Sequence, residues 1–184
     1  MNDLTPDDLL AALAGRYSVG PKQMTEPAPT PAHLHLAAQL ALRAPDHLGL
    51  HPFRFVSVAS DQRAALGDLF ARAAQRRGLD DTEVAAARRR AHNGPALLAV
   101  IGRLREDVDD VPLHEQWMCI GGAVMNLLNA LHLLGYGAKV VSGSSVRDGE
   151  VQAAFCAPGE VLVAWVIAGT PTRSTRARPT RPSR

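Results

Sequence analysis

The hydrophobic positions of this chain alternate between a helical and a strand-like repeat. Leucines spaced three and four apart predict a first helix over residues 6–14, with Thr5 as its cap. A second helix is predicted over residues 31–43, and Pro45 ends it because the residue before a proline is pushed out of the helical region. Residues 15–30 are so rich in Gly, Pro and polar side chains that we expect no packed element there.

Short apolar runs farther along the chain predict strands. Residues 96–102 are continuously apolar, which is typical of a strand buried on both faces, whereas residues 53–59 alternate and carry β-branched side chains. The predicted strands are 53–59, 96–102, 138–143 and 160–169. Helical patterns lie at 60–78, 81–92, 112–135 and 149–155.

Residues 112–135 form the longest of these patterns. Apolar side chains occupy nearly every side of this predicted helix, so we expect it to lie in the middle of the core. Helices and strands are interleaved along the whole chain. This order predicts an α/β or α+β domain built around one central helix.

Composition narrows the class of protein. With 184 residues, of which 46% are hydrophobic, the chain fits one globular domain with a real core. The net charge of +2 conceals five arginines in the final dozen or so positions, without which the body is slightly acidic. We therefore predict a single domain over residues 1–171 and a basic tail over residues 172–184. A slightly acidic body offers no basic face to nucleic acid, which is not expected as a partner.

Cysteine use and the N-terminus bear on the compartment. Cys119 and Cys156 lie in separate apolar patterns without C-x-x-C spacing, which predicts buried thiols in a reducing compartment. The N-terminus lacks a basic region followed by an apolar core, and no apolar run approaches the roughly 20 residues of a membrane span. We expect a cytoplasmic protein that does not enter a membrane.

Two kinds of reactive site find little support. Cys119 is the obvious nucleophile, with His114 five positions earlier, but both lie on the helix predicted to be core, where a structural thiol is favoured. The seven histidines never adopt H-E-x-x-H spacing or pair with cysteines at metal-binding intervals. The sequence therefore predicts neither a cysteine nucleophile nor a metal site.

Phosphate binding is better supported. Arg16, Tyr17 and Ser18 follow the first helix directly and supply a guanidinium and a hydroxyl within three residues. Such groups suit a phosphate monoester. An arginine at a helix end also complements the helix dipole, so both interpretations stay open at this point.

A second concentration of polar chemistry lies at the break "LRAPDHLGLHPFRF", residues 42–55. Pro45 ends the second predicted helix. Asp46 and His47 follow it directly, a few residues before a predicted strand. Arg43 and His47 are thus expected at one rim of the fold, where they could face a polar cofactor. A solvated surface loop is the alternative.

Several ordered motifs together resemble the nitroreductase family of FMN-dependent oxidoreductases, and in particular the small bacterial NAD(P)H nitroreductases. The resemblance covers about residues 10–171. The motifs that carry it are R-x-S at 16–18, R-A-P-D-H at 43–47, E-Q at 115–116, G-x-A-V-M at 121–125 and G-T-P at 169–171. Each fragment alone is weak, whereas the ordered set is specific.

The resemblance implies an α+β nitroreductase-like fold, with a mixed or antiparallel sheet around a long core helix. It also implies an intertwined homodimer with two FMN sites, each built from both chains. The implied activity passes hydride from NAD(P)H through flavin N5 to a small electron-poor acceptor such as a nitroaromatic or a quinone. Because the cofactor carries this chemistry, no catalytic acid or base is assigned.

The resemblance also assigns site residues. Arg16, Tyr17 and Ser18 fall where contacts to the FMN phosphate and ribityl chain begin. Arg43 and His47 fall where the partner chain reaches the flavin.

The segment at the edge of the isoalloxazine ring departs from the family pattern. Val140, Val141 and Ser142 occupy it, where relatives often carry Trp-Arg-Ser. Backbone N–H groups can still bind the ring. The missing arginine is expected to lower the reduction potential, because a cation near the N1/N5 edge favours the reduced anionic flavin. The alternative function is a flavin-binding protein of the same fold with little turnover.

Overall fold

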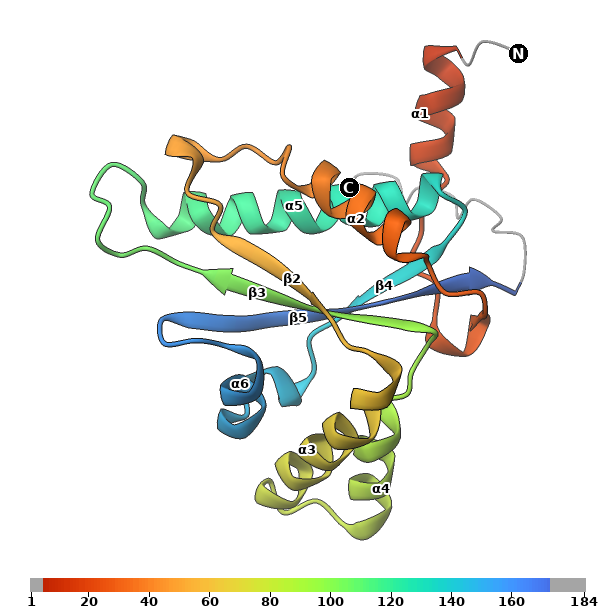
Figure 1. Ribbon diagram of the computed structural model, residues 1–184, viewed down its shortest axis with the longest axis vertical. Coiled ribbons are helices and arrows are strands. Elements are labelled where there is room, and N and C mark those ends of the chain that lie inside the picture. Colours follow the sequence, from red (N-terminus) through yellow and green to blue (C-terminus); the bar gives the residue numbers. More distant parts are fainter. Residues whose placement is uncertain (1–4, 173–184) are drawn as a thin grey trace, which may run out of the picture.

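A central antiparallel sheet organises the computed structural model, which describes residues 5–172 (Figure 1). Its strands are β1 (Met24–Thr25), β2 (Phe53–Ser57), β3 (Ala96–Arg103), β4 (Gly137–Val141) and β5 (Glu160–Pro171). Strand β5 pairs with β1, β3 and β4, and β2 pairs with β3. Every one of these pairs is antiparallel. The α+β class expected from the sequence is confirmed.

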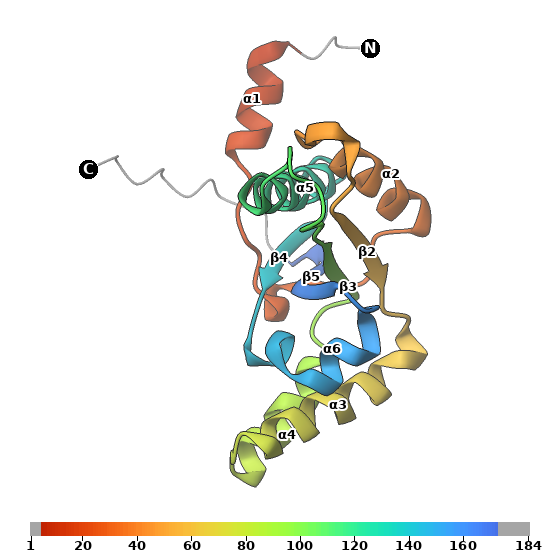
Figure 2. The same ribbon diagram turned by 90° about the vertical axis from the view of Figure 1, so that its left-hand side faces the viewer.

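Helices cover both faces of the sheet (Figures 1 and 2). The upper layer holds α1 (Pro6–Ala14), α2 (Pro31–Ala41) and α5 (Leu113–Leu133), and the lower layer holds α3 (Arg63–Arg76), α4 (Asp81–Arg90) and α6 (Gly149–Phe155). Short 3-10 turns join them: η1 (Pro21–Gln23), η2 (His47–Gly49), η3 (Ser60–Gln62) and η4 (Ser144–Arg147).

Two hydrophobic clusters, one on each face, hold the layers to the sheet. Because successive strand residues point to opposite faces, β3 serves both clusters. Leu98 and Val100 belong to the cluster under α2 and α5, whereas Leu97, Ala99 and Ile101 belong to the cluster over α3 and α4. The first seven residues of β3 are all buried, which confirms the prediction of a strand buried on both faces.

The interval between the first two helices was predicted wrongly. Ser18 forms an isolated parallel bridge with Ala138, and β1 pairs with Thr170 and Pro171 at the end of β5. Turn η1 lies between these two contacts. The hydrogen-bonding partners of this interval come from strands more than a hundred residues away, so local composition carries no sign of them.

Helix α5 is buried on one side only. Cys119, Leu127 and Leu131 face the sheet and are buried. On the opposite side Met118 is 72% exposed, and Trp117 and Met125 are also exposed. The expectation that this helix is surrounded by core is therefore corrected for the single chain. Because α5 carries apolar side chains on nearly every side, the side turned away from the sheet is an exposed apolar face.

A buried arginine holds the connection between α4 and β3. Arg63, only 5% exposed, donates from Nη1 to the carbonyl of Ala91 (2.8 Å), from Nη2 to that of Pro95 (3.3 Å) and from Nε to that of Val58 (3.4 Å). Burial lowers the pKa of this guanidinium. The arginine thereby fixes the turn that contains Asn93 and Gly94.

Gly94 is expected to tolerate no side chain. Its φ is +69°, and a Cβ there would lie 2.3 Å from Cγ2 of Ile167. Gly78 has a similar φ of +72° with open space around it, so Gly78→Ala provides a matched control. We expect Gly78→Ala to cost about 1–2 kcal/mol of unfolding free energy. Gly94→Ala should cost about 1–3 kcal/mol more, because of overpacking.

Urea unfolding of the two glycine variants measures the difference, provided that the denaturant slope is unchanged. Equal losses in the two variants would show that Ile167 moves aside freely. The close contact would then not constrain this turn.

Candidate functional site

The segment after α1 runs beside the first residues of β4. Besides the Ser18–Ala138 bridge, the Val19 N–H donates to the Ala138 carbonyl at 3.1 Å. A Cβ on Gly137 would lie 2.8 Å from Val19 Cγ2, so the glycine permits this close approach. Strand β4 thus holds the predicted residues Arg16, Tyr17 and Ser18 along its edge.

Alternation along β4 separates the predicted site residues that follow. Val140 packs against the upper hydrophobic cluster, and Val141 packs against the lower one. Ser142 comes directly after the strand and is exposed. Of these three residues, Val141 borders a cavity of about 490 Å³ below the sheet, which we name the lower cavity.

The lower cavity combines apolar and polar walls. Leu97, Trp165 and Ile167 of the sheet contribute apolar surface, together with Phe70 of α3. Trp165 stacks edge-on against Phe70 (ring centroids 5.5 Å apart), and its buried indole N–H has no hydrogen-bond partner in the described residues. Polar groups come from Arg90, Asn93, Lys139, Ser144 and Ser145.

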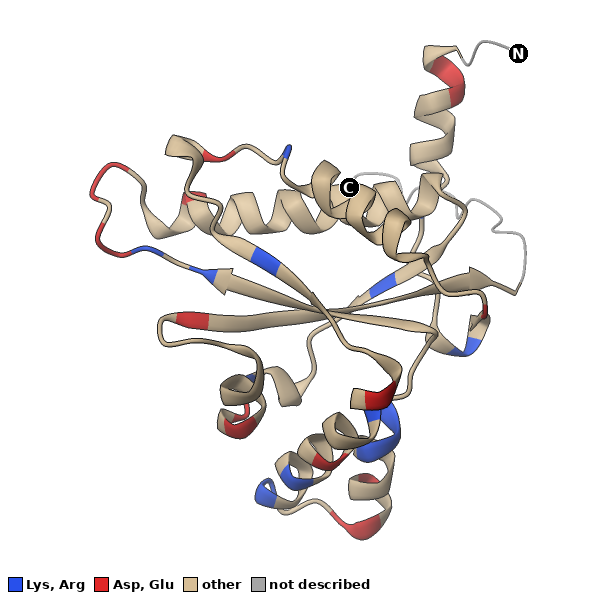
Figure 3. Cartoon of the chain, in the orientation of Figure 1, with Lys and Arg blue, Asp and Glu red and all other residues tan. Residues whose placement is uncertain are grey.

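Two cations on the lower cavity have no carboxylate partner among the described residues. Within residues 5–172, neither Arg90 nor Lys139 forms an ion pair, whereas Arg76 and Arg88 on the same layer are paired with carboxylates. Figure 3 shows the basic end of α4 and the single basic position on β4. Unpaired positive charge at a cavity favours an anionic or electron-rich ligand.

Arg90 and Lys139 were not predicted as site residues from the sequence. Arg90 is the last of three consecutive arginines at the end of α4, where basic side chains are common because they stabilise the helix dipole. Lys139 carried a usable signal, because residues two apart on a strand share a face and Lys139 stands two before Val141. The position of Arg90 beside β4 depends on tertiary packing alone.

Arg43 and His47 lie elsewhere in the chain. Arg43 is exposed just after α2. His47 Nδ1 is 2.8 Å from Oε2 of Glu115, in the first turn of α5. Here a second hollow of about 820 Å³, which we name the upper cavity, opens beside α5. Its lining residues are Pro45, Asp46, His47, His114, Glu115, Met118, Cys119 and Gly122.

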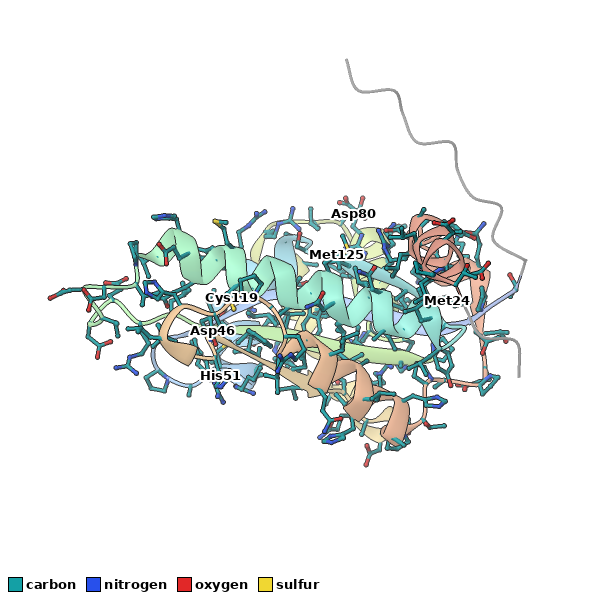
Figure 4. The ribbon with its side chains drawn as sticks, turned by 90° about the horizontal axis from the view of Figure 1, so that it is seen from above. Met24, Asp46, His51, Asp80, Cys119 and Met125 are labelled. Atoms are coloured by element: carbon teal, nitrogen blue, oxygen red, sulfur yellow. The ribbon has the colours of Figure 1, made fainter. Side chains whose placement is uncertain are left out.

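The turn that carries His47 has an unusual backbone. Leu48 (φ +59°), Gly49 (φ +64°) and His51 (φ +48°) all adopt positive φ, which L-residues rarely do. Asp46 holds the turn, because its carboxylate accepts from the N–H of Leu50 at 3.0 Å and from the N–H of His51 at 2.8 Å. Asp46 and Cys119 of α5, both labelled in Figure 4, line the same cavity.

Cys119 is chemically quiet in this setting. Burial, with a smaller contribution from the charge of Asp46, raises the pKa of its thiol to about 11. The thiol therefore stays protonated at neutral pH and is a poor nucleophile. The predicted burial is confirmed for Cys119, whereas Cys156, also predicted to be buried, is only partly buried.

A single chain does not bring all the predicted residues together. Arg16 and Tyr17 line a small cavity with His132, in the last turn of α5, whereas His47 binds Glu115 in its first turn. These two helix positions are about 26 Å apart at about 1.5 Å per residue. The structure thus sets Arg16–Ser18 beside the start of β4, the strand that ends in Val140 and Val141. It leaves Arg43 and His47 near the other end of α5.

The described part of the chain lacks two features. None of its helices has the length and hydropathy needed to cross a membrane. Over the same residues, no group of three or more His, Cys, Asp or Glu side chains is arranged to hold a metal ion.

Comparison with known proteins identifies the family. The sequence pattern that defines the nitroreductase family matches residues 13–170. A Haemophilus influenzae protein named "Putative NAD(P)H nitroreductase" is 30% identical over 164 residues, 89% of this chain and 88% of the relative. The Escherichia coli K12 protein "Putative NAD(P)H nitroreductase YdjA" is also 30% identical, with the same shares covered.

Solved structures agree on the fold. A nitroreductase-like family protein from Bacillus cereus superposes with a TM-score of 0.78 at 17% identity, over 99% of this chain and 94% of that one. A Desulfovibrio desulfuricans structure described as a "putative nitroreductase in complex with FMN" superposes with a TM-score of 0.70 at 21% identity. The superposition covers 97% of this chain and 94% of that one. By its sequence pattern, its relatives and its fold, this chain belongs to the nitroreductase family.

Proposed function

We propose that this protein is an FMN-dependent oxidoreductase that passes hydride from NAD(P)H through flavin N5 to a small electron-poor acceptor, such as a nitroaromatic or a quinone. One observation carries the proposal. Arg16 and Ser18, which carry a guanidinium and a hydroxyl, lie in the segment beside the start of β4, and a cavity of ligand size lies at the end of the same strand. Family membership and the names of the relatives point to the same chemistry.

The residues along β4 fit the parts of FMN. Arg16 and Ser18 suit the phosphate. From Ala138 to Val141 the strand advances about 10 Å, at about 3.3 Å per residue, a span comparable to that between the FMN phosphate and its ring system. The ring would enter the lower cavity, whose volume of about 490 Å³ and apolar walls suit an aromatic system.

The polar groups of the lower cavity also fit the ring. Arg90 and Lys139 complement the electron-rich pyrimidine end, and the serines of η4 can hydrogen-bond its carbonyls. Beyond Ala138, no described strand pairs with the outer edge of β4. Backbone N–H groups at Val140 and Ser142 therefore remain available to a ligand, whereas the N–H of Val141 points toward Trp165 of β5.

Bound FMN would supply the hydride chemistry, and the protein would supply position and exclusion of water. In this proposal Arg16 and Ser18 anchor the phosphate. Val141 and Trp165 form a dry wall, while Arg90 and Lys139 favour negative charge in the cavity.

A second copy of the chain would complete the site. All twelve large hydrophobic side chains that the described residues expose lie on α1, α2, α5 or the segment that joins α2 to β2. Apolar surface confined to one layer is typical of an obligate interface. A two-fold axis across α5 would bring Arg43 and His47 of one subunit toward the β4 site of the other. We therefore include a homodimer with shared FMN sites in the proposal.

Colour and bleaching test the proposed function. Purified protein should be yellow, or become yellow with one added FMN per chain, and should bleach when NADH or NADPH is added without oxygen. A nitroaromatic or quinone should then restore the colour. Colourless protein that takes up no FMN would contradict the proposal.

A second candidate function, a flavin-binding protein with little turnover, is favoured by one observation. Val140 and Val141 lack the arginine that relatives often carry at the flavin edge. Yellow protein that nicotinamide nucleotides fail to bleach would favour this candidate. The cations Arg90 and Lys139 favour turnover instead, because they bring positive charge to the cavity from other positions.

Replacing Arg90 is expected to lower the potential of the bound flavin. Arg90→Gln removes a positive charge that stabilises the anionic reduced form, so the midpoint potential should fall by about 30 mV, equivalent to about 1.4 kcal/mol for two electrons. Arg89→Gln is a matched control, since it changes the same charge one residue away without lining the cavity. Equilibrium titration against a reference dye measures both potentials. Equal potentials in the two variants would place Arg90 away from the flavin.

A further inference from the structure

The upper cavity points to a proton donor for the acceptor. We propose that His47 of one subunit, oriented by Glu115 of the same subunit, protonates the acceptor as it is reduced at the partner's flavin. This inference rests on the proposed function and its shared site. It assigns His47 a catalytic role and Glu115 a positioning role.

The hydrogen bond between the two residues determines which nitrogen can act. Glu115 Oε2 lies 2.8 Å from His47 Nδ1, and an ionised carboxylate only accepts hydrogen bonds. Nδ1 therefore carries its hydrogen toward Glu115. In the imidazolium form, Nε2 carries the second hydrogen, which is the one free to leave.

The backbone around His47 is held in a conformation that few sequences adopt. Leu48 and His51 are both non-glycine residues at positive φ, and the Asp46 carboxylate binds two N–H groups of this turn. Such conformations persist only where the surroundings enforce them, and they concentrate at functional sites. The turn thus fixes the backbone that follows His47, and Glu115 orients the imidazole.

Other titratable groups line the upper cavity beside His47. They are Glu115 and His114 from α5, Asp46 from the same turn as His47, and Cys119. The Cys119 thiol has a pKa of about 11 and releases its proton poorly. His47 and Glu115 are 50% and 39% exposed in the single chain, so the pair can regain a proton from water.

The reaction needs one proton for each hydride. A quinone takes a hydride and a proton to become a hydroquinone. A nitroarene takes a hydride and a proton, loses one oxygen as water and becomes a nitrosoarene. In both cases His47 would break its Nε2–H bond, and the proton would form a new O–H bond on the acceptor. Ferricyanide, by contrast, takes one electron at a time and no proton.

The comparison of quinone with ferricyanide supplies the test. The FMN-loaded dimer is reduced without oxygen, and stopped-flow absorbance follows its oxidation by benzoquinone or by ferricyanide. We expect His47→Gln to lower the ratio of the two rates by about 100-fold, in the range of general acid catalysis. Glu115→Gln should lower this ratio by about tenfold. It should also shift the pH dependence of the quinone rate, which a merely structural residue would leave in place.

Two controls accompany these variants. His114→Gln changes a second histidine of the same cavity, next to Glu115, and should leave the ratio as in the unmodified protein. Added imidazole should raise the ratio in a His47→Gly variant, which separates loss of the proton donor from damage to the fold.

The outcomes separate the inference from the proposed function. A ratio unchanged by His47→Gln, in protein that is still reduced by NAD(P)H, would overturn the inference and leave the proposed function standing. A loss in His114→Gln instead of His47→Gln would also overturn it. If the unmodified protein binds no FMN, the proposed function fails and this inference fails with it.

Discussion

A heterodimer with complementary damage is expected to bind one FMN with near-normal affinity, even where both parent homodimers bind weakly. One chain carries Arg43→Ala and His47→Ala, and the other carries Arg16→Ala and Ser18→Ala. If each site is built from residues 16–18 of one chain and residues 43–47 of the other, one site of the heterodimer contains all four substitutions. The other site then contains only native residues. Each parent homodimer instead has two half-damaged sites.

The length of α5 is the physical reason for this expectation. His47 is hydrogen-bonded to the first turn of the helix, and Arg16 lies near its last turn. Because the two ends are far apart, Arg16 and His47 of one chain cannot both contact the same FMN. Fluorescence titration of the isolated heterodimer with FMN measures the stoichiometry and affinity. Two equally weak sites would show that residues 43–47 serve their own chain, and the shared site would be wrong.

A carboxylate on the exposed face of α5 is expected to break the dimer and release FMN. Met125 is 45% exposed in the single chain and lines none of the three cavities described above. Met125→Glu would bury an uncompensated charge, which costs about 3–5 kcal/mol, and a two-fold interface receives it twice. Sedimentation velocity with absorbance at the flavin band measures dimer and cofactor together.

Ala85→Glu is the matched control for this substitution. Ala85 is an exposed residue of α4 on the lower layer, where the described residues expose no large hydrophobic side chain. The same added charge there should leave both dimer and FMN unchanged. A Met125→Glu protein that stays dimeric and fully loaded would remove α5 from the interface.

Local sequence rules predicted most of the elements. Thr5 caps the first helix as expected, and the Asp8 carboxylate accepts in return from the Thr5 N–H. The predicted strand at 53–59 is observed as Phe53–Ser57, and the one at 160–169 extends to Pro171. These predictions succeed because caps, prolines and apolar periodicity act within a few residues along the chain.

The candidate site could be predicted only in part. Ordered motifs singled out residues 16–18, 43–47 and 140–142, but their spacing cannot say which of them meet. The structure sets the first and last of these segments along β4 and attaches His47 to the far end of α5. Arg90 was missed because its neighbours in the sequence are equally basic. Only the packing of α4 beneath the sheet distinguishes it.

The sequence by itself determined the family, the α+β class and the existence of an apolar helix long enough to cross the whole domain. It could not determine which side of that helix the chain leaves uncovered, because an all-round apolar pattern looks the same for a core and for an interface. Tertiary structure decided this, together with the pairing of residues 18 and 24–25 with distant strands. It also placed at the lower cavity two cations that form no ion pair with any residue in the described range 5–172. The physical reason is common to all three. Periodicity reports how a segment folds on itself, whereas its partners are chosen by strand edges and layer packing far away in the sequence.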